Sequence, residues 1–200
     1  EAALAFLPAR KTVITGYPVR AAFFDQDRSQ ARAALGLASD ARVLVVAGAT
    51  QGAKAINAAI FAALPALLSS VTVFHVTGPA DAPRAQDLRD ALEPALAARY
   101  QPAAFREDLP TIMVAADLAV MRAGASVLGE LPAAKLPSIL VPGTFAGGHQ
   151  RDNARFLADG GAAVVLEEAD LAGLTALAES LLSNPARLAA MRDAAAALAR

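Results

Sequence analysis

The sequence predicts an α/β fold in which helices cover both faces of one doubly wound, mostly parallel sheet. Three observations support this prediction. Short apolar runs rich in β-branched residues alternate with longer segments of helical periodicity. Most of these runs are apolar throughout, which is typical of strands buried on both faces. Hydrophobic residues make up 56% and charged residues 18% of the 200 residues, so the chain can bury a sizeable core.

Seven segments are candidate strands. In chain order they are 12–15, 42–47, 71–76, 102–105, 117–121, 137–141 and 162–166. Helical segments and short loops separate them, as crossover connections between parallel strands require. The chain contains no internal repeat and no low-complexity linker, so we expect residues 1–200 to form a single domain.

Local signals place the helices between these strands. Ile56, Ile60, Leu64 and Leu68 recur at steps of four, which predicts a helix with one buried stripe. Pro65 would kink or shorten that helix.

Other residues mark helix ends. We expect Asp27 to cap the start of a helix that Gly36 ends. The run Ser183-Asn184-Pro185 supplies a capping residue followed by proline at the first helical position.

Composition excludes several classes of function. The net charge is −1 with no basic block, so nucleic acid is not an expected partner. There is no cysteine, no zinc-ligand spacing and no unbroken apolar run of the ~18 residues that a membrane span needs. The pair Asp25 and Asp27 falls at a helix start, so we expect neither a metal nor another cofactor. The first residues do not resemble a signal peptide and lack an initiator methionine, which suggests an excised fragment.

Sheets of this kind bind ligands at the carboxyl ends of their strands, so the loops there are candidate sites. The first is Gly16-Tyr17-Pro18-Val19-Arg20, whose turn would hold Arg20 at the mouth of the sheet. An arginine there can pair with a phosphate through two hydrogen bonds. The segment also fits a plain turn with a surface arginine, and both interpretations stay open.

The second loop follows the strand 42–47 and leads into a helix. Its small residues would let a ligand approach the backbone, and the helix start offers free N–H groups to an anion. The candidates are Gly48, Thr50, Gln51 and Gly52. A tight strand-to-helix turn without a ligand explains the composition equally well.

The third loop is Arg122-Ala123-Gly124-Ala125-Ser126, in which Ser126 is well placed to cap the next helix. Glu130 lies one turn further on, where a carboxylate could accept the two hydroxyls of a ribose. The alternative is a favourable negative charge in a first helical turn.

The fourth loop, 142–153, ends in polar residues suited to sugar hydroxyls, among them His149, Gln150 and Asn153. The alternative is a polar helix start. Elsewhere, His75 lies within an apolar run and is interpreted as structural. Glu167 and Glu168 are interpreted as solvated charge, because neighbours on an extended segment point to opposite faces.

Four motifs taken together resemble one family. They are TGYPVR at 15–20, GATQGAKAIN at 48–57, RAGASVLGE at 122–130 and HQRDNA at 149–154. In this order and spacing they are similar to the C-terminal domain of the MurG-type transferases, which have two Rossmann-like domains in the GT-B architecture. The resemblance covers the chain from about residue 11 onward.

The resemblance implies a role for each matching position. Arg20 and the Thr50 loop would face a diphosphate, the backbone at Arg106 would read uracil, and Glu130 would hold the ribose. The N–H groups of Ala125 and Ser126 would lie near the phosphates and the sugar. The positions expected to contact the donor are Arg20, Gly48, Thr50, Gln51, Gly52, Arg106, Arg122, Gly124, Ala125, Ser126, Glu130, His149, Gln150 and Asn153.

The resemblance also implies an activity for the full-length protein. The family transfers N-acetylglucosamine from UDP-N-acetylglucosamine to a muramyl peptide carried on undecaprenyl diphosphate, with inversion and on the cytoplasmic face of the plasma membrane. The acceptor and the catalytic base belong to an N-terminal domain to which nothing here corresponds, so we expect this chain alone to be inactive. Three alternatives stay open: a diacylglycerol-type transferase, a UDP-N-acetylglucosamine 2-epimerase, and a non-catalytic nucleotide-binding module.

Overall fold

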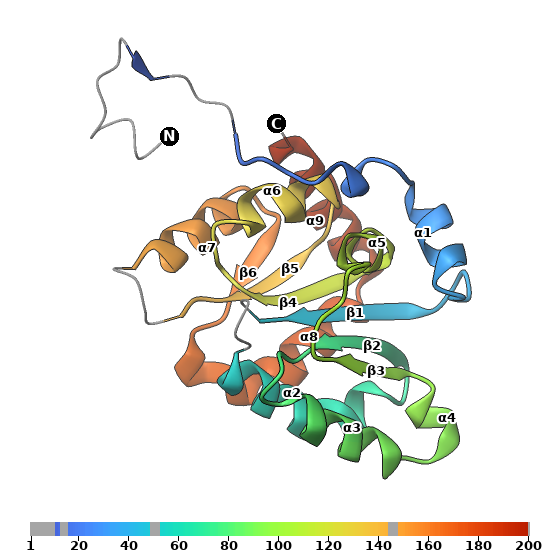
Figure 1. Cartoon of the computed structure of the whole chain (residues 1–200). Coiled ribbons are helices and arrows are strands. Elements are labelled where there is room, and N and C mark those ends of the chain that lie inside the picture. Colours follow the sequence, from blue (N-terminus) through green and yellow to red (C-terminus); the bar gives the residue numbers. More distant parts are fainter. Residues whose placement is uncertain (1–10, 13–15, 49–52, 144–147, 200) are drawn as a thin grey trace.

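The fold is built on one six-stranded sheet in which every pair of neighbouring strands is parallel (Figure 1). The computed structural model describes residues 11–12, 16–48, 53–143 and 148–199. The spatial order is β3-β2-β1-β4-β5-β6. The strands are β1 (Arg42–Ala47), β2 (Val71–Val76), β3 (Tyr100–Ala103), β4 (Leu118–Arg122), β5 (Ser138–Val141) and β6 (Ala163–Val165).

Helices cover both faces of this sheet. Figure 1 shows α2, α3 and α8 against one face and α5, α6 and α7 against the other. The helical elements are η3 (Ala21–Phe23), α1 (Arg28–Ala34), α2 (Lys54–Leu67), α3 (Ala82–Asp90), α4 (Pro94–Ala97), α5 (Leu109–Ala115), α6 (Val127–Ala133), α7 (His149–Asp159), η4 (Glu168–Gly173), α8 (Leu174–Leu182) and α9 (Pro185–Leu198). None of the helices within the described ranges combines the length and the apolar character that crossing a membrane requires.

Alternation along the central strand creates two cores. Leu44 and Val46 of β1 pack in the cluster that includes Ile60 of α2. Val43 and Val45 pack on the opposite face, in the cluster formed with α5, α6 and α7. All four β1 residues are fully buried. The prediction that continuously apolar runs are covered on both faces is therefore confirmed.

The candidate strands compare closely with the observed ones. The ranges 42–47 and 71–76 coincide with β1 and β2, and the last three candidates agree with β4, β5 and β6 to within one residue at each end. Candidate 102–105 was placed two residues too late, since β3 begins at the buried Tyr100, opposite Val73. Pro102 obscured that strand, and it is tolerated because β3 lies at the edge of the sheet. Most of candidate 12–15 lies outside the described residues.

Most predicted helix ends are confirmed. Helix α2 buries Ile56, Ile60 and Leu64, and it continues past Pro65 only to Leu67. Asp27 forms a capping box with Gln30.

Gly36, with φ of +65°, follows the end of α1, and Asn184 caps α9 by accepting from the N–H of Arg187. The prediction for Ser126 was wrong. It occupies the N-cap position of α6, but its side chain makes no capping bond. Its backbone is already helical, with φ −62° and ψ −29°, whereas a capping side chain needs an extended backbone.

His75 is structural, as predicted. It is fully buried in β2, with Nδ1 3.0 Å from the Tyr100 hydroxyl and Nε2 3.0 Å from Asn57 Oδ1. Asn57, in turn, donates to the carbonyl of Thr77 and to Asp81. Burial lowers the pKa of His75 to about 4, so the ring is neutral at physiological pH. This network joins β2, β3 and the start of α2.

Candidate functional site

A cavity of about 420 Å³ opens at the carboxyl ends of the central strands. It lies where the strand order changes direction, between β1 and β4, which is the usual ligand position in such sheets. It is lined by Tyr17, Arg20, Ala47, Gly48, Val76, Gly78, Ala104, Phe105, Arg106, Leu109, Met121, Arg122, Gly124, Ala125, Ser126, Val127 and Glu130. Eight of the predicted site residues are therefore brought together here: Arg20, Gly48, Arg106, Arg122, Gly124, Ala125, Ser126 and Glu130.

A larger hollow of about 980 Å³ lies elsewhere, lined in part by Arg42, Ser70 and Thr72. Arg42 begins β1, Ser70 precedes β2 and Thr72 is the second residue of β2, so most of the lining comes from the amino half of the strands, although Arg106 and Asp108 after β3 also reach it. The hollow thus opens toward the amino ends of the strands, away from the switch point. We take the smaller cavity as the candidate site because parallel sheets bind ligands at the carboxyl edge.

Arg20 and Glu130 face each other at the rim of the cavity. Arg20 Nη2 lies 3.5 Å from Glu130 Oε1, and the two side chains are 52% and 16% exposed. The guanidinium of Arg20 also lies 5.7 Å from the centre of the Phe23 ring. At this distance and exposure the ion pair is weak, so either group can turn to a ligand at little cost.

Gly129 of α6 sets the position of Arg20. A Cβ atom at residue 129 would lie 2.6 Å from Val19 Cγ2 and 3.0 Å from Tyr17 Cδ1. The segment before η3 can therefore lie directly on α6 only because residue 129 has no side chain. That close contact brings Arg20 alongside the neighbouring Glu130.

Ala125 and Ser126 supply free backbone donors. In the described part of the chain, the first N–H of this turn to be hydrogen-bonded is that of Val127, which donates to the carbonyl of Gly124. The N–H groups of Ala125 and Ser126 form no such bond and belong to residues that line the cavity. Unpaired N–H groups at the start of a helix favour an anion.

Arg122 lines the cavity, but its charge is already neutralised by a carboxylate of the protein. Its guanidinium forms an ion pair with Glu168 and reaches the carbonyls of Val141 and Pro142 at 3.4 and 3.3 Å. The side chain is 13% exposed. Arg122 therefore joins β4 to the loop after β5 and to η4.

The same contact corrects the interpretation of Glu168 as solvated charge, whereas Glu167 stays a solvent-exposed charge in an exposed ion pair. Glu168 pairs with Arg122, and Glu167 pairs with Arg151 at 2.8 Å. Glu168 begins η4, so the two residues do not share the extended segment that was predicted, and each carboxylate pairs with an arginine from a different element. Sequence periodicity could not show these partners, because they lie on distant elements.

Arg106 forms a bidentate ion pair with Asp108, with nitrogen–oxygen distances of 2.7 and 2.6 Å. The hydrogen bonds from Arg106 lower the pKa of Asp108, and the same bonds raise the pKa of Arg106. The pair fixes the turn after β3, where the backbone of Arg106 was predicted to read a base. The neighbouring Phe105 is 74% exposed at the rim of the cavity.

The predicted sugar-binding residues do not line the cavity. His149 is exposed at the start of α7. Gln150 Oε1 accepts from the N–H of Gly143 at 2.8 Å, and Asn153 Nδ2 donates to the carbonyl of Ala123 at 3.0 Å. Gln150 and Asn153 therefore attach α7 to the loops after β5 and β4.

Three predicted contacts, Thr50, Gln51 and Gly52, lie outside the described residues. Among the residues that are described, no group of three potential metal ligands comes together. Sequence reasoning did not select Gly78 or Leu109, which also line the cavity. Gly78 has φ of +77° two residues after the end of β2, and its place in a loop after a strand was the available signal.

The sheet order and helix arrangement place the chain among the Rossmann-like halves of GT-B glycosyltransferases. MurG of Acinetobacter baumannii superimposes with a TM-score of 0.75 at 29% identity, over 97% of this chain and 54% of that one. The C-terminal CMP-Kdo binding domain of WaaA, also from A. baumannii, has the same fold with a TM-score of 0.62 at 14% identity, over 90% of this chain and 98% of that one.

The family follows from the sequence match. The model of the glycosyltransferase family 28 C-terminal domain matches residues 42–200, and this chain belongs to that family. A protein of Roseiflexus sp. is 39% identical over 95% of this chain, and one of Desulforudis audaxviator is 38% identical over all of it. Both are named UDP-N-acetylglucosamine–N-acetylmuramyl-(pentapeptide) pyrophosphoryl-undecaprenol N-acetylglucosamine transferase. The chain spans 48% and 56% of these two relatives, about half their length.

Proposed function

We propose that residues 1–200 form the donor-binding domain of a transferase that moves N-acetylglucosamine from UDP-N-acetylglucosamine to a lipid-linked muramyl peptide. The observation that carries this proposal is the cavity at the switch point, where Arg20, Glu130 and the N–H groups of Ala125 and Ser126 meet. Cation, carboxylate and free N–H donors together match a nucleoside diphosphate. The names of the relatives supply the sugar and the acceptor.

Different residues would bind different parts of the donor. The N–H groups of Ala125 and Ser126 bind the diphosphate, together with Arg20 and the loop that contains Gly48. Glu130 accepts the ribose hydroxyls once Arg20 has turned from it to the phosphates. The backbone at Arg106 reads the uracil edge. His149 and Gln150 contact the sugar hydroxyls, and Asn153 holds α7 in place.

The chemical contribution of this domain is stabilisation of the leaving group. As the acceptor hydroxyl attacks the anomeric carbon, the bond to UDP breaks and negative charge grows on the diphosphate. N–H donors held at the start of α6, together with Arg20 once it has turned to the phosphates, would lower the barrier without a metal. We assign the acceptor, the catalytic base and the contact with the cytoplasmic membrane face to the other half of a family-length protein, so this chain alone is expected to be inactive.

Calorimetric titration of the 200-residue chain tests the donor assignment. UDP, UDP-N-acetylglucosamine, UDP-galactose and ADP are titrated without metal, and Glu130→Ala is compared with the unaltered chain. We expect binding that requires uridine and prefers the N-acetylglucosamine sugar. Loss of the ribose contact should weaken UDP binding at least tenfold, about 1.4 kcal/mol.

Each other outcome points to a different function. Equal binding of ADP and UDP would contradict the proposal and favour a general nucleotide-binding module. Uridine binding that ignores the sugar would contradict the assignment of N-acetylglucosamine, leave the sugar and the acceptor open, and agree with a non-catalytic nucleotide-binding module. Turnover of UDP-N-acetylglucosamine by this chain alone would contradict the assignment of the base to another domain and revive the epimerase alternative.

A further inference from the structure

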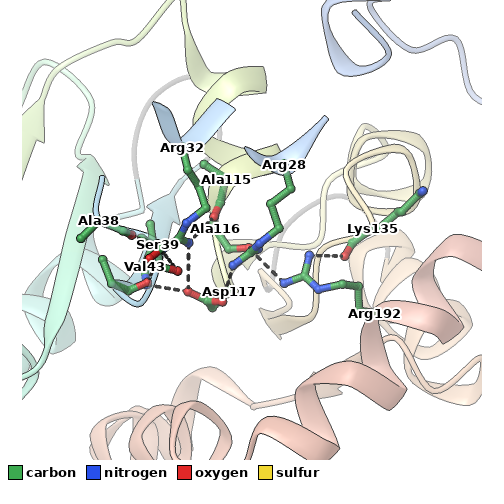
Figure 2. Close-up of polar contacts among 11 residues, drawn as sticks. Arg28, Arg32, Ala38, Ser39, Val43, Ala115, Ala116, Asp117, Lys135 and Arg192 are labelled. Atoms are coloured by element: carbon green, nitrogen blue, oxygen red, sulfur yellow. Dashed lines mark hydrogen bonds and ion pairs between the residues drawn. The ribbon is translucent and has the colours of Figure 1, made fainter. Parts of the chain in front are cut away.

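The opposite edge of the sheet carries a dense group of arginines (Figure 2). Asp117, directly before β4, is the carboxylate at its centre. Its Oδ2 accepts from the N–H of Val43 at 2.8 Å, and its Oδ1 pairs with Arg28 at 2.6 Å. Arg32 Nη1 lies 3.7 Å from the same carboxylate. Both oxygens of Asp117 are therefore occupied by β1 and α1.

Arg192 of α9 joins this group without a carboxylate of its own. It donates to the carbonyls of Lys135 and Ala116 at 3.1 and 3.2 Å, and it has no ion pair within the described residues. Burial, followed by the positive charge of Arg28, lowers the pKa of Arg192 to about 10. The guanidinium remains charged at pH 7, and the carboxylates that act on it, Asp117 and Asp193, are outnumbered by Arg28, Arg32 and Arg192, so this part of the protein holds excess positive charge.

Arg42, the first residue of β1, adds a free cation. It is exposed, and the described part of the chain gives it neither a hydrogen bond nor an ion pair from its side chain. Arg42, Arg28 and Arg192 line one cavity of about 310 Å³. Its two carboxylates are Asp117, which is already engaged, and the exposed Asp193, and its walls come from apolar residues of α8 and α9.

We propose that this cavity binds a tetrahedral oxyanion of the phosphate class between Arg42 and Arg192, with Arg28 behind them. Guanidinium groups recognise phosphate oxygens through paired hydrogen bonds, and the anion would supply the missing negative charge. The cavity is large enough for a phosphate with attached water or with a small ester group. It lies at the amino edge of the sheet, so its anion is distinct from the diphosphate proposed for the carboxyl edge.

Arginine side-chain NMR tests this site. The 200-residue chain with nitrogen-15 in its arginines is titrated with inorganic phosphate at constant ionic strength, with chloride as the control anion. We expect saturable shifts of the Nε–H signals of Arg42 and Arg192. Arg42→Ala should weaken phosphate binding about fivefold, the effect of one exposed charge contact. Arg187→Ala removes an exposed arginine from the same helix α9, outside the cavity, and should leave phosphate binding unchanged.

The titration is repeated with UDP at saturating concentration. Shifts at Arg42 and Arg192 that persist with UDP show a site separate from the donor cavity, and they are expected even if the donor proposal fails. Shifts that never saturate, that chloride reproduces, or that survive Arg42→Ala unchanged would overturn the proposal.

Vesicles then distinguish the two sources of a phosphate group. Sedimentation with phosphatidylglycerol vesicles that is lost in Arg42→Ala, set against phosphatidylcholine vesicles, would identify a lipid headgroup as the ligand. Binding of inorganic phosphate without sedimentation would identify a free phosphate or a small phosphate ester. Absence of both kinds of binding contradicts the site.

Discussion

Arginine–carboxylate pairs stand at both edges of the sheet, and they are built differently. At the amino edge, Asp117 holds Arg28 at 2.6 Å and also accepts the N–H of Val43. At the carboxyl edge, Arg20 lies 3.5 Å from Glu130, and more than half of the Arg20 side chain is exposed. The first pair is committed to joining β1, β4 and α1, whereas the second leaves its groups available. We expect the Asp117 pair to serve stability and the Arg20–Glu130 pair to serve the proposed donor site, whereas the anion proposed for the amino edge would use Arg42 and Arg192 beside the Asp117 pair.

The largest expected effect is at the amino edge. Asp117→Ala leaves Arg28 and the buried Arg32 without their carboxylate and the N–H of Val43 without its acceptor. Removing one partner of a fully buried ion pair costs about 3–5 kcal/mol of unfolding free energy, and we expect a loss toward the lower end because Arg28 is 33% and Asp117 20% exposed. Denaturant unfolding measures the loss, and UDP affinity per folded molecule should not change.

Asp117→Asn is the matched control, because its amide oxygen can still accept from Val43. It should lose distinctly less stability than Asp117→Ala. A loss below about 1 kcal/mol in Asp117→Ala would remove the basis of the comparison between the two edges.

His75 challenges the comparison, because it lies near the carboxyl end of β2 yet has both ring nitrogens bonded. Its pKa is about 4 in the folded protein, against about 6.5 in an unfolded chain. Between these values the unfolded state binds more protons, so stability that is complete above about pH 6.5 is lost as the pH falls through 4. The titration of His75 changes the unfolding free energy by about 3 kcal/mol over this pH range.

His75→Gln removes this titration. Its unfolding free energy should therefore depend less on pH between 7 and 4.5 than that of the unaltered chain, as chemical denaturation at several pH values would show. Parallel pH curves for the two proteins would mean that His75 does not contribute the acid sensitivity.

The two edges also differ in how well the sequence predicted them. Strand and helix positions followed from apolar periodicity and from caps such as Asp27, because these signals are local. Glu130 and Arg20 were predicted as site residues from loop position and from the resemblance, and the structure brings them together. The role of Asp117 was missed, since its partners lie more than 70 residues away along the chain. The ion pair of Arg122 with Glu168 was missed for the same reason.

A matched pair of arginine substitutions sharpens the comparison. Arg20→Ala should weaken UDP binding about tenfold, which is about 1.4 kcal/mol, and change the unfolding free energy by no more than about 0.5 kcal/mol. Arg28→Ala should lower the unfolding free energy and leave UDP affinity unchanged, because its guanidinium donates to Asp117 and to the carbonyl of Ala116. Calorimetry with UDP and denaturant unfolding on both variants give the four values. Equal effects of the two substitutions on either quantity would contradict the separation of roles.

The smallest expected effect comes from Gly129→Ala, which moves Arg20 without removing it. The added methyl group would lie 2.6 Å from Val19 Cγ2, so the segment that carries Arg20 must shift away from α6. Alanine also favours the helix, which offsets part of the strain, so the net change in unfolding free energy should stay within about 1 kcal/mol. UDP affinity should fall about threefold by calorimetry, since the cation is displaced by only a few tenths of an ångström.

Gly173→Ala, whose methyl group would meet nothing within 4 Å, is the control and should leave UDP affinity unchanged. Unchanged affinity in Gly129→Ala as well would show that Arg20 reaches its ligand without the close contact between its segment and α6.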